Sequence, residues 1–371
     1  MIRTRLFRGV AVAGIATAAL AASLGLPAAN AAPLTVPTTS PAALPKLPTA
    51  PVVRIGFFAN VTHAPALIAV QLRLFETFLG KDGTAVEYTV FGNGPAEIEA
   101  MKGGAIDVGY IGPNPAITGY TSTGGTLLRI VSGAAQGGAQ FITKQNINSA
   151  ADLKGKKIAT PQLGGTQDIA LRSYLKDNGL TYTSTGGGDV AIIPTENSTT
   201  LSLFRRGDLD GAWVPEPWAS RLVLEGGGKV FIDEKNLWPE GKYVTTQIIA
   251  SQKFLAQYPG TVRSILQANN SAIKYIAANV DKAKDVVQVQ IKRWTGTQLA
   301  DPVINRAWGN LRFSWEPLPE QFKKSADDAV NAGLLTLGAN KLAGIYDLRL
   351  LNQVLKAGKA RPVTAGGLGR D

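Results

Sequence analysis

The 371-residue chain contains no cysteine, and this absence limits both its covalent and its metal chemistry. It excludes disulfide bonds, thiolate metal sites, cysteine nucleophiles and a lipidated N-terminal cysteine. Histidine is almost as scarce, since His63 is the only one in the chain. One histidine and scattered carboxylates have no spacing typical of a metal site, so we expect neither a metal nor another cofactor.

Motifs for binding nucleic acids and nucleotides are also missing. The formal net charge is +11, but the lysines and arginines are dispersed and are not interleaved with aromatic residues. We therefore expect no nucleic-acid partner and interpret the basic charge as a solvated surface that mildly favours anionic solutes. The segment Gly92-Asn93-Gly94 lacks the other glycines and the following acid of a dinucleotide-binding fingerprint.

Residues 1–31 have the three parts of a secretory signal peptide. A start with three arginines precedes an apolar run over residues 10–26 and a small-residue cleavage site at Ala29-Asn30-Ala31. We predict export to a periplasmic or extracytoplasmic location, without lipid attachment, and cleavage would lower the net charge to +8. The alternative is an uncleaved anchor, because the apolar run is close to the minimum length for a membrane span.

After this segment, residues 32–51 are rich in Pro, Thr, Ala and Leu, with one charge at Lys46. This composition predicts an extended linker without a core. The rest of the chain is long enough for two domains, each with its own core. The predicted boundaries are a signal peptide at 1–31, a linker at 32–51, a first lobe formed by 52–138 plus 248–371, and a second lobe at 139–247.

The folded part alternates between strand and helix patterns, which predicts an α/β fold with mostly parallel sheets. From residue 259 onward the pattern is helical, and we expect these helices to cover the first lobe. Strands are predicted at 52–58, 86–91, 106–111, 127–133, 141–144, 157–160, 190–194, 211–214, 230–233 and 246–250. Helices are predicted at 66–79, 95–102, 166–178, 198–206, 218–224, 259–278, 280–294, 302–310, 319–332 and 345–355.

Two similar junctions, at residues 101–115 and 207–218, stand out in this pattern. Each has a glycine, an aspartate three residues later, a short apolar strand and a Pro-x-Pro segment that starts a helix. Each therefore places a helix N-terminus at the carboxyl end of a strand, where open α/β sheets bind ligands. The recurrence predicts two similar lobes facing a cleft. The alternative is chance repetition of a common strand–turn–helix junction.

Three segments carry a resemblance to a known family. They are the run Ala-Ile-Asp-Val-Gly-Tyr-Ile-Gly-Pro at 105–113, Asp-Leu-Lys-Gly-Lys-Lys-Ile at 152–158 leading into Gly164-Gly165-Thr166, and Asp-Gly-Ala-Trp-Val-Pro-Glu-Pro at 210–217. With them the chain resembles the solute-binding proteins of ABC importers, and more narrowly the nitrate, taurine and aliphatic-sulfonate receptors. The resemblance covers roughly residues 52–355.

The resemblance implies a two-lobed, type II periplasmic-binding-protein-like fold with two hinge crossings, near Gly137-Gly138 and Thr245-Thr246. It also implies closure of the lobes over a small anionic or zwitterionic solute. The expected partners are this solute and an ABC permease with its ATPase, and the receptor is expected to be a monomer.

The candidate ligand-binding residues lie at the predicted helix entries and crossings. Backbone N–H groups at such entries bind anions without a basic side chain. Instead of contacting the ligand, Thr62 can cap the next helix, and His63 can be an ordinary loop residue. The candidates are Asn60, Thr62, His63, Gly112, Asn114, Gln136, Gln140, Gly165, Thr166, Gln167, Glu216, Trp218 and Thr246.

Several candidates have structural alternatives. Asn114 can be a turn residue only, and the glutamines beside the first crossing can lie on the surface. Glu216 can complement a helix dipole; if it faces the cleft it disfavours a bare anion and suits a ligand that also carries an amine, such as taurine. Trp218 belongs either to the core or to a wall that covers an apolar part of the ligand.

Two other functions stay open at this point. A sensory receptor for a membrane signalling protein has the same sequence features. Enzymes on related folds, the sulfinate desulfinases and the thiamine-pyrimidine synthases, are similar in fold but depend on cysteine motifs that this chain lacks. We therefore expect a receptor and not an enzyme, with catalysis at Glu216 or His63 as the remaining enzymatic alternative.

Overall fold

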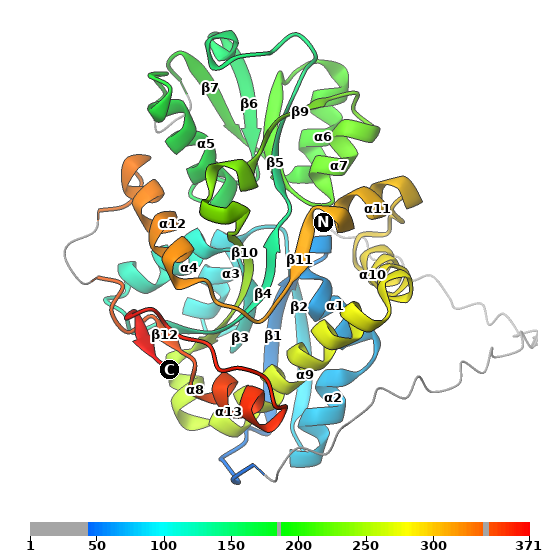
Figure 1. Ribbon diagram of the computed structural model, residues 1–371, viewed down its shortest axis with the longest axis vertical. Coiled ribbons are helices and arrows are strands. Elements are labelled where there is room, and N and C mark those ends of the chain that lie inside the picture. Colours follow the sequence, from blue (N-terminus) through cyan, green and yellow to red (C-terminus); the bar gives the residue numbers. More distant parts are fainter. Residues whose placement is uncertain (1–43, 184–186, 337–340) are drawn as a thin grey trace, which may run out of the picture. The chain divides into compact units, whose positions relative to one another are not determined.

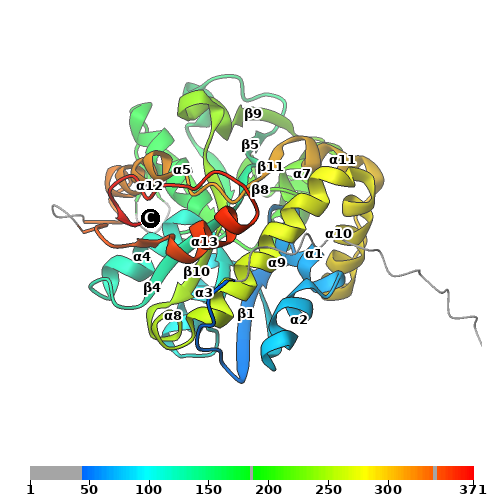
Figure 2. The same cartoon turned by 60° about the horizontal axis from the view of Figure 1, so that its bottom comes forward.

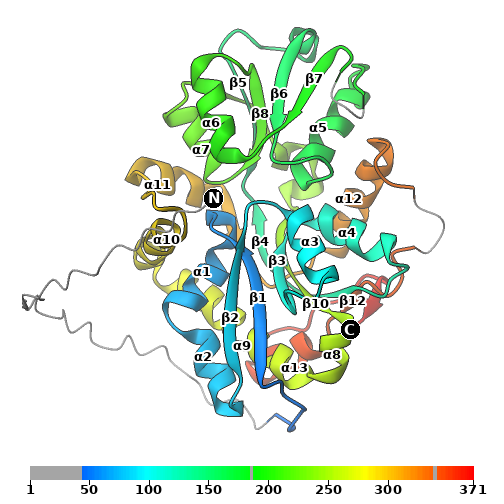
Figure 3. The same ribbon diagram turned by 180° about the vertical axis from the view of Figure 1, so that it is seen from behind.

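The computed structural model describes residues 44–183, 187–336 and 341–371. The predicted signal peptide and most of the predicted linker lie outside the described residues. Within this part, the chain forms two β-sheets flanked by helices (Figures 1 and 3). No helix of the described part is both long and apolar enough to cross a membrane.

The first sheet has the strand order β13-β12-β4-β10-β3-β1-β2, with β11 paired to β4. Strand β1 is parallel to both β2 and β3, and its inward residues Val53, Ile55 and Phe57 are fully buried. The strands are β1 (Val52–Phe58), β2 (Ala85–Phe91), β3 (Val108–Ile111), β4 (Leu128–Gly137), β10 (Val244–Ser251), β11 (Leu311–Phe313), β12 (Tyr346–Asp347) and β13 (Gly369–Arg370).

The second sheet has the strand order β7-β6-β8-β5-β9. Its core includes Phe141 on β5 and Trp213 on β8, whose stacked ring centroids lie 5.2 Å apart. The strands are β5 (Ala139–Thr143), β6 (Lys156–Thr160), β7 (Val190–Pro194), β8 (Gly211–Pro215) and β9 (Lys229–Asp233).

Two crossings connect these sheets, as expected from the family resemblance. The first lies between β4 and β5, where Gly137 and Gly138 have φ angles of 74° and 76°. A Cβ atom on Gly138 would lie 2.3 Å from the Leu311 side chain, so both conformation and space require glycine there. The chain returns to the first sheet in β10. Strands β5 and β10, which follow the crossings, run antiparallel to their neighbours. Other neighbours, such as β1 and β2 or β6 and β7, are parallel, so both sheets are mixed.

Most helices agree with the predicted pattern. Helix α8 (Gln252–Gln257) was not predicted, α4 (Pro113–Ser122) was predicted only by its start, and two predicted helices differ in extent. The predicted helix at 66–79 is divided at Arg73, whose φ of 52° interrupts the helical backbone. The helix predicted from residue 345 starts only at Arg349, because Tyr346 belongs to a short strand that pairs with both β4 and β13. The helices are α1 (Ala64–Gln71), α2 (Leu74–Leu79), α3 (Gly94–Lys102), α4 (Pro113–Ser122), α5 (Thr166–Asp177), α6 (Asn197–Arg206), α7 (Trp218–Leu224), α8 (Gln252–Gln257), α9 (Pro259–Ala278), α10 (Val280–Thr295), α11 (Asp301–Gly309), α12 (Pro319–Asn331) and α13 (Arg349–Ala357), with short 3-10 turns η1 (Val61–His63), η2 (Gly80–Asp82), η3 (Ala150–Leu153), η4 (Glu234–Leu237) and η5 (Pro239–Gly241).

The C-terminal helices contact both lobes. Helix α9 packs against α1, α2 and α13, and α10 packs against α1, all on the first sheet (Figure 2). In contrast, α11 packs against α7 and α12 against α5, which both belong to the second sheet. This third of the chain therefore covers the first lobe and also joins it to the second.

Candidate ligand-binding cleft

A small cavity of about 50 Å³ lies where helix entries from both lobes meet. This volume has room for about three or four water molecules, so the two lobes approach each other closely in this structure. None of the lining residues is Asp, Glu, Lys or Arg. The lining consists of Phe58, Asn60, Thr62, His63, Gly92, Asn93, Gly94, Pro95, Gly112, Pro115, Pro161, Gln162, Gly165, Thr166, Gln167, Asn197, Pro215 and Thr245.

The N-terminal ends of α3, α4, α5 and α6 all contribute to this lining. The first N–H groups of a helix have no partner within it and carry the positive end of the helix dipole. In α5, the backbone N–H groups of Thr166 and Gln167 have no hydrogen-bond acceptor among the described residues. Several such ends around one cavity favour a bound anion without a basic side chain.

Gly112 and Thr166 are the point of close approach between the lobes. Gly112 precedes α4, and a Cβ atom at this position would lie 2.5 Å from Thr166 Oγ1 at the start of α5. Its φ of −71° is open to any residue, so the reason for glycine here is space and not conformation. The absent side chain lets the two helix entries face the same cavity.

His63 is buried in the wall of the cavity with both ring nitrogens engaged. Nε2 lies 3.0 Å from the Tyr110 carbonyl oxygen, and Nδ1 lies 3.0 Å from Thr62 Oγ1. Since a carbonyl only accepts, Nε2 carries the proton and the Thr62 hydroxyl donates to Nδ1. Burial lowers the His63 pKa to about 3, so the ring is neutral at physiological pH. The cavity lining is therefore uncharged.

Hydrogen bonds between side chains and backbone hold the rest of this wall. Trp218 Nε1 on α7 donates to Asn60 Oδ1 over 3.1 Å, which connects the second lobe to the first. Thr246 Oγ1 on β10 donates to the Thr62 carbonyl over 3.0 Å. The side-chain nitrogen of Asn60, Nδ2, makes no hydrogen bond within the described part of the chain and is available as a donor.

Glu216 lies outside this lining, in a network near the first crossing. It is fully buried, and its carboxylate accepts hydrogen bonds from the Ser220 backbone N–H and hydroxyl, and from Arg306 Nη1 (3.2 Å) and Asn310 Nδ2 (2.7 Å). Arg306 Nη2 also donates to Gln140 Oε1 over 2.7 Å. Burial raises the Glu216 pKa, and the hydrogen bonds from Asn310 and Ser220 oppose that rise.

The structure brings seven of the predicted site residues together in the lining. These are Asn60, Thr62, His63, Gly112, Gly165, Thr166 and Gln167. The other six, Asn114, Gln136, Gln140, Glu216, Trp218 and Thr246, lie outside it. Asn114, for example, donates from Nδ2 to the Ser325 carbonyl over 2.8 Å and so holds α12. Ligand contact by any of the thirteen stays a prediction.

Four polar lining residues were not among the sequence candidates: Asn93, Gln162, Asn197 and Thr245. Asn93 precedes α3, where its Oδ1 accepts from the Ala96 N–H over 3.0 Å. Asn197 begins α6, and its Oδ1 is buried without a hydrogen-bond partner in the described residues. Asn93, Gln162 and Asn197 each follow a predicted strand within three residues, so the strand-to-helix rule applied to every junction would have found them.

Two α/β lobes, two crossings and a cleft of helix N-termini define the periplasmic-binding-protein fold. The alkanesulfonate-binding protein SsuA of Xanthomonas axonopodis pv. citri, solved bound to MOPS, has a TM-score of 0.66 to this structure at 22% sequence identity, covering 78% of this chain and 96% of that one. The chain belongs to the NMT1-like family, whose model matches residues 47–291.

Curated relatives are also binding proteins. A binding protein of Brucella abortus (strain 2308) is 27% identical over 241 residues, which are 65% of this chain and 72% of that protein. The taurine-binding periplasmic protein of Escherichia coli (strain K12) is 25% identical over 226 residues, which are 60% of this chain and 68% of that protein. These relatives are named for binding and not for catalysis.

Proposed function

We propose that this protein is the extracytoplasmic solute-binding component of an ABC importer, with a small sulfonate, nitrate or taurine-like solute as its ligand. The observation that carries the proposal is the uncharged cavity surrounded by helix N-termini from both lobes. Such a site pairs an anion with backbone N–H groups and helix dipoles. The names of the relatives support this solute class.

The surroundings of Glu216 favour the acid group of the solute over its amine as the main point of recognition. Its carboxylate is satisfied by Arg306, Asn310 and Ser220 outside the cavity lining. An amine on a zwitterionic solute would instead meet neutral acceptors, of which the buried Asn197 Oδ1 has no partner in the described part of the chain. Taurine therefore stays within the proposed class without an ion pair to its amine.

Delivery follows from hinge motion. The lobes rotate about Gly137-Gly138 and Thr245-Thr246, the solute stabilises the closed form, and the closed form docks on a permease. The protein acts outside the cytoplasmic membrane after export directed by residues 1–31, as a monomeric receptor that does not transform its ligand. The relatives, named as periplasmic and as binding proteins, support this location and this role.

The test is thermal unfolding of residues 32–371 with nitrate, sulfate, bicarbonate, taurine, and alkyl and aryl sulfonates. A solute at 100 times its dissociation constant adds about 2.7 kcal/mol of stability when it binds only the folded form. We expect one solute class to stabilise the protein and Gln167→Ala to reduce that shift. Gln145→Ala, at an exposed position outside the cavity, is the matched control and keeps it. An unchanged unfolding temperature with every solute would overturn the proposed ligand class.

A further inference from the structure

A second pocket, of about 450 Å³, lies at the end of β4 that is remote from the first crossing. Arg129, one of its lining residues, is seven positions before Gln136 on this strand, so the pocket is roughly 23 Å from the crossing. Its volume falls within the range of small-molecule sites. Arg349 and Arg370, which also line it, lie beyond the residues matched by the family model.

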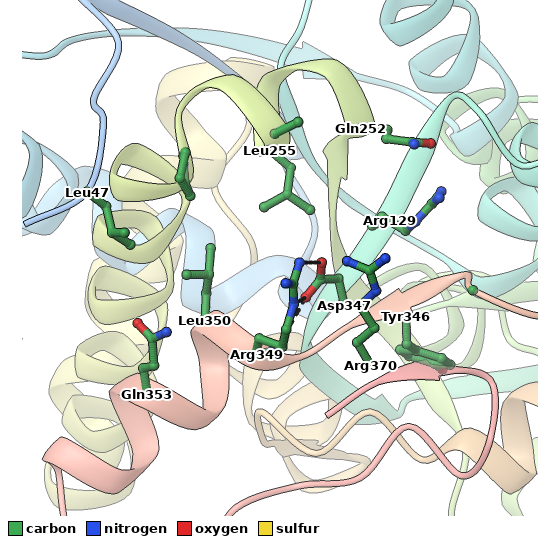
Figure 4. A pocket seen from close by; sticks show the side chains of 13 residues that line it. Leu47, Arg129, Gln252, Leu255, Tyr346, Asp347, Arg349, Leu350, Gln353 and Arg370 are labelled. Atoms are coloured by element: carbon green, nitrogen blue, oxygen red, sulfur yellow. Dashed lines mark hydrogen bonds and ion pairs between the residues drawn. The ribbon is translucent and has the colours of Figure 1, made fainter. Parts of the chain in front are cut away.

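Three arginines and one carboxylate form the polar side of this pocket. Figure 4 shows Arg349 and Arg370 on the two sides of Asp347, and Arg129 next to them on the side toward Gln252. Asp347 is paired with Arg349 through contacts of 2.6 and 2.9 Å. In the described part of the chain it is the only acid in the lining, and it forms no ion pair with Arg129 or Arg370.

Both of these arginines, Arg129 and Arg370, have N–H groups without a hydrogen-bond acceptor in the described residues. Arg129 uses Nη1 for the carbonyl oxygens of Gly125 and Leu128, each at 2.7 Å, and its other nitrogens make no hydrogen bond in the described chain. The side chain of Arg370 makes no hydrogen bond or ion pair within the described residues. A planar guanidinium with free donors is suited to a carboxylate or phosphate group.

The opposite side of the pocket is apolar. Leu47, Leu255 and Leu350 lie on the side away from Arg129 and Arg370 in Figure 4, together with Gln353. Leu255 and Leu350 are each 8% exposed. Gln252 lies on the arginine side, and its buried Oε1 has no partner among the described residues. A hydroxyl next to an anionic group would satisfy this acceptor.

We propose that this pocket is a binding site for an anionic amphiphile. Arg129 and Arg370 hold the acid group, Arg349 stays paired with Asp347 at its side, and a short apolar chain covers Leu255 and Leu350. A lipid head group and a soluble alkyl phosphate or fatty acid share this chemistry. The site is separate from the cleft and goes beyond the proposed solute capture.

Titration calorimetry of residues 32–371 with octyl phosphate, below its micelle concentration, tests the site. We expect saturable binding that weakens at least tenfold in Arg129→Gln/Arg370→Gln and changes less than twofold in Arg361→Gln, an exposed arginine outside the pocket. Gln167→Ala in the cleft is expected to leave this binding unchanged, and octyl glucoside, which lacks the charge, is expected not to bind. Thermal unfolding of each variant verifies folding.

Three results would overturn the proposal: no binding of octyl phosphate, equal binding by the folded double variant, or loss of binding in Gln167→Ala, which would place the amphiphile in the cleft. Vesicle sedimentation then identifies the source. Retention on phosphatidylglycerol but not phosphatidylcholine vesicles, lost in the double variant, assigns the site to a lipid. Octyl phosphate binding without retention assigns it to a soluble amphiphile.

Discussion

Arg306 Nη1 lies 3.2 Å from Glu216 Oε1, and this ion pair joins α11 to the end of β8 in the second lobe. The same network touches the first crossing, because the Glu216 N–H donates to the Gly138 carbonyl over 2.8 Å and Arg306 also holds Gln140. The pair is separated by ninety positions in the sequence. The pair therefore fixes the strand after the first crossing against α11.

Replacement of Arg306 by alanine is expected to destabilise the protein by about 2 to 3 kcal/mol. Removing one partner of a fully buried pair costs about 3 to 5 kcal/mol, and the value here is lower because the Arg306 side chain is 23% exposed. Urea unfolding measures the loss, and Arg312→Ala, at an exposed position on β11, is the control. Adding Glu216→Gln to Arg306→Ala should recover part of the lost stability, because no unpaired carboxylate is then buried. A double variant that is much less stable than Arg306→Ala would contradict the pairing.

Glu234 is expected to make the protein less stable as the pH rises from about 4.5 to 7. The side chain is buried, and burial raises its pKa to about 7 although Trp213 Nε1 (2.7 Å) and Trp238 Nε1 (3.3 Å) donate to it. The folded state therefore holds a proton that the unfolded chain releases near its ordinary pKa. Over this window the linkage amounts to about 3 kcal/mol.

The measurement compares urea unfolding of the wild type and Glu234→Gln at pH 5 and pH 8. The difference between the two proteins isolates Glu234 from other titrating groups, and it should favour the wild type at the lower pH by about 3 kcal/mol relative to the higher. A difference that does not change with pH would show that Glu234 is ionised in the folded state throughout this range.

His63 is expected to stay neutral through the range in which an exposed histidine gains a proton. Its pKa is lowered to about 3 by burial, so below pH 6.5 the unfolded chain binds a proton that the folded chain does not, and stability contributed by His63 falls on acidification. Because the chain has one histidine, its ring signals in NMR spectra are unambiguous. We expect no titration of the ring between pH 8 and pH 5, and a midpoint near 6.5 would refute the buried placement.

Gly112→Ala is expected to weaken binding of the cleft solute at least tenfold while the fold stays intact. The added Cβ would lie 2.5 Å from Thr166 Oγ1 and would keep the two lobes apart. In Gly112→Ala/Thr166→Ala the nearest Thr166 atom becomes Cβ, at 3.6 Å, so approach of the lobes should be restored. The control is Gly80→Ala, where an added Cβ has no neighbour within 4 Å. Titration with the solute identified by thermal unfolding measures the effect; equal affinity in both single variants would contradict it.

Local sequence patterns were sufficient to predict most of the secondary-structure elements and the fold class. The limits of β1, α7 and α9 agree with the predictions, because strand length, apolar period and Pro or Gly at the ends act within a few residues. The same local signals place Gly112 and Gly165 at helix entries. The signal peptide, the lobe boundaries and the ligand contacts stay predictions.

Which of these helix entries meet, and which side chains are paired elsewhere, depends on long-range packing. The partner of Glu216 is Arg306 on a helix that has no local signal for it, and Asn93 and Asn197 reach one cavity from two different lobes. The basic pocket likewise combines Leu47, Arg129 and Arg370 from three distant parts of the chain. Such contacts depend on how whole elements pack, and a pattern that spans one strand or helix contains no information about them.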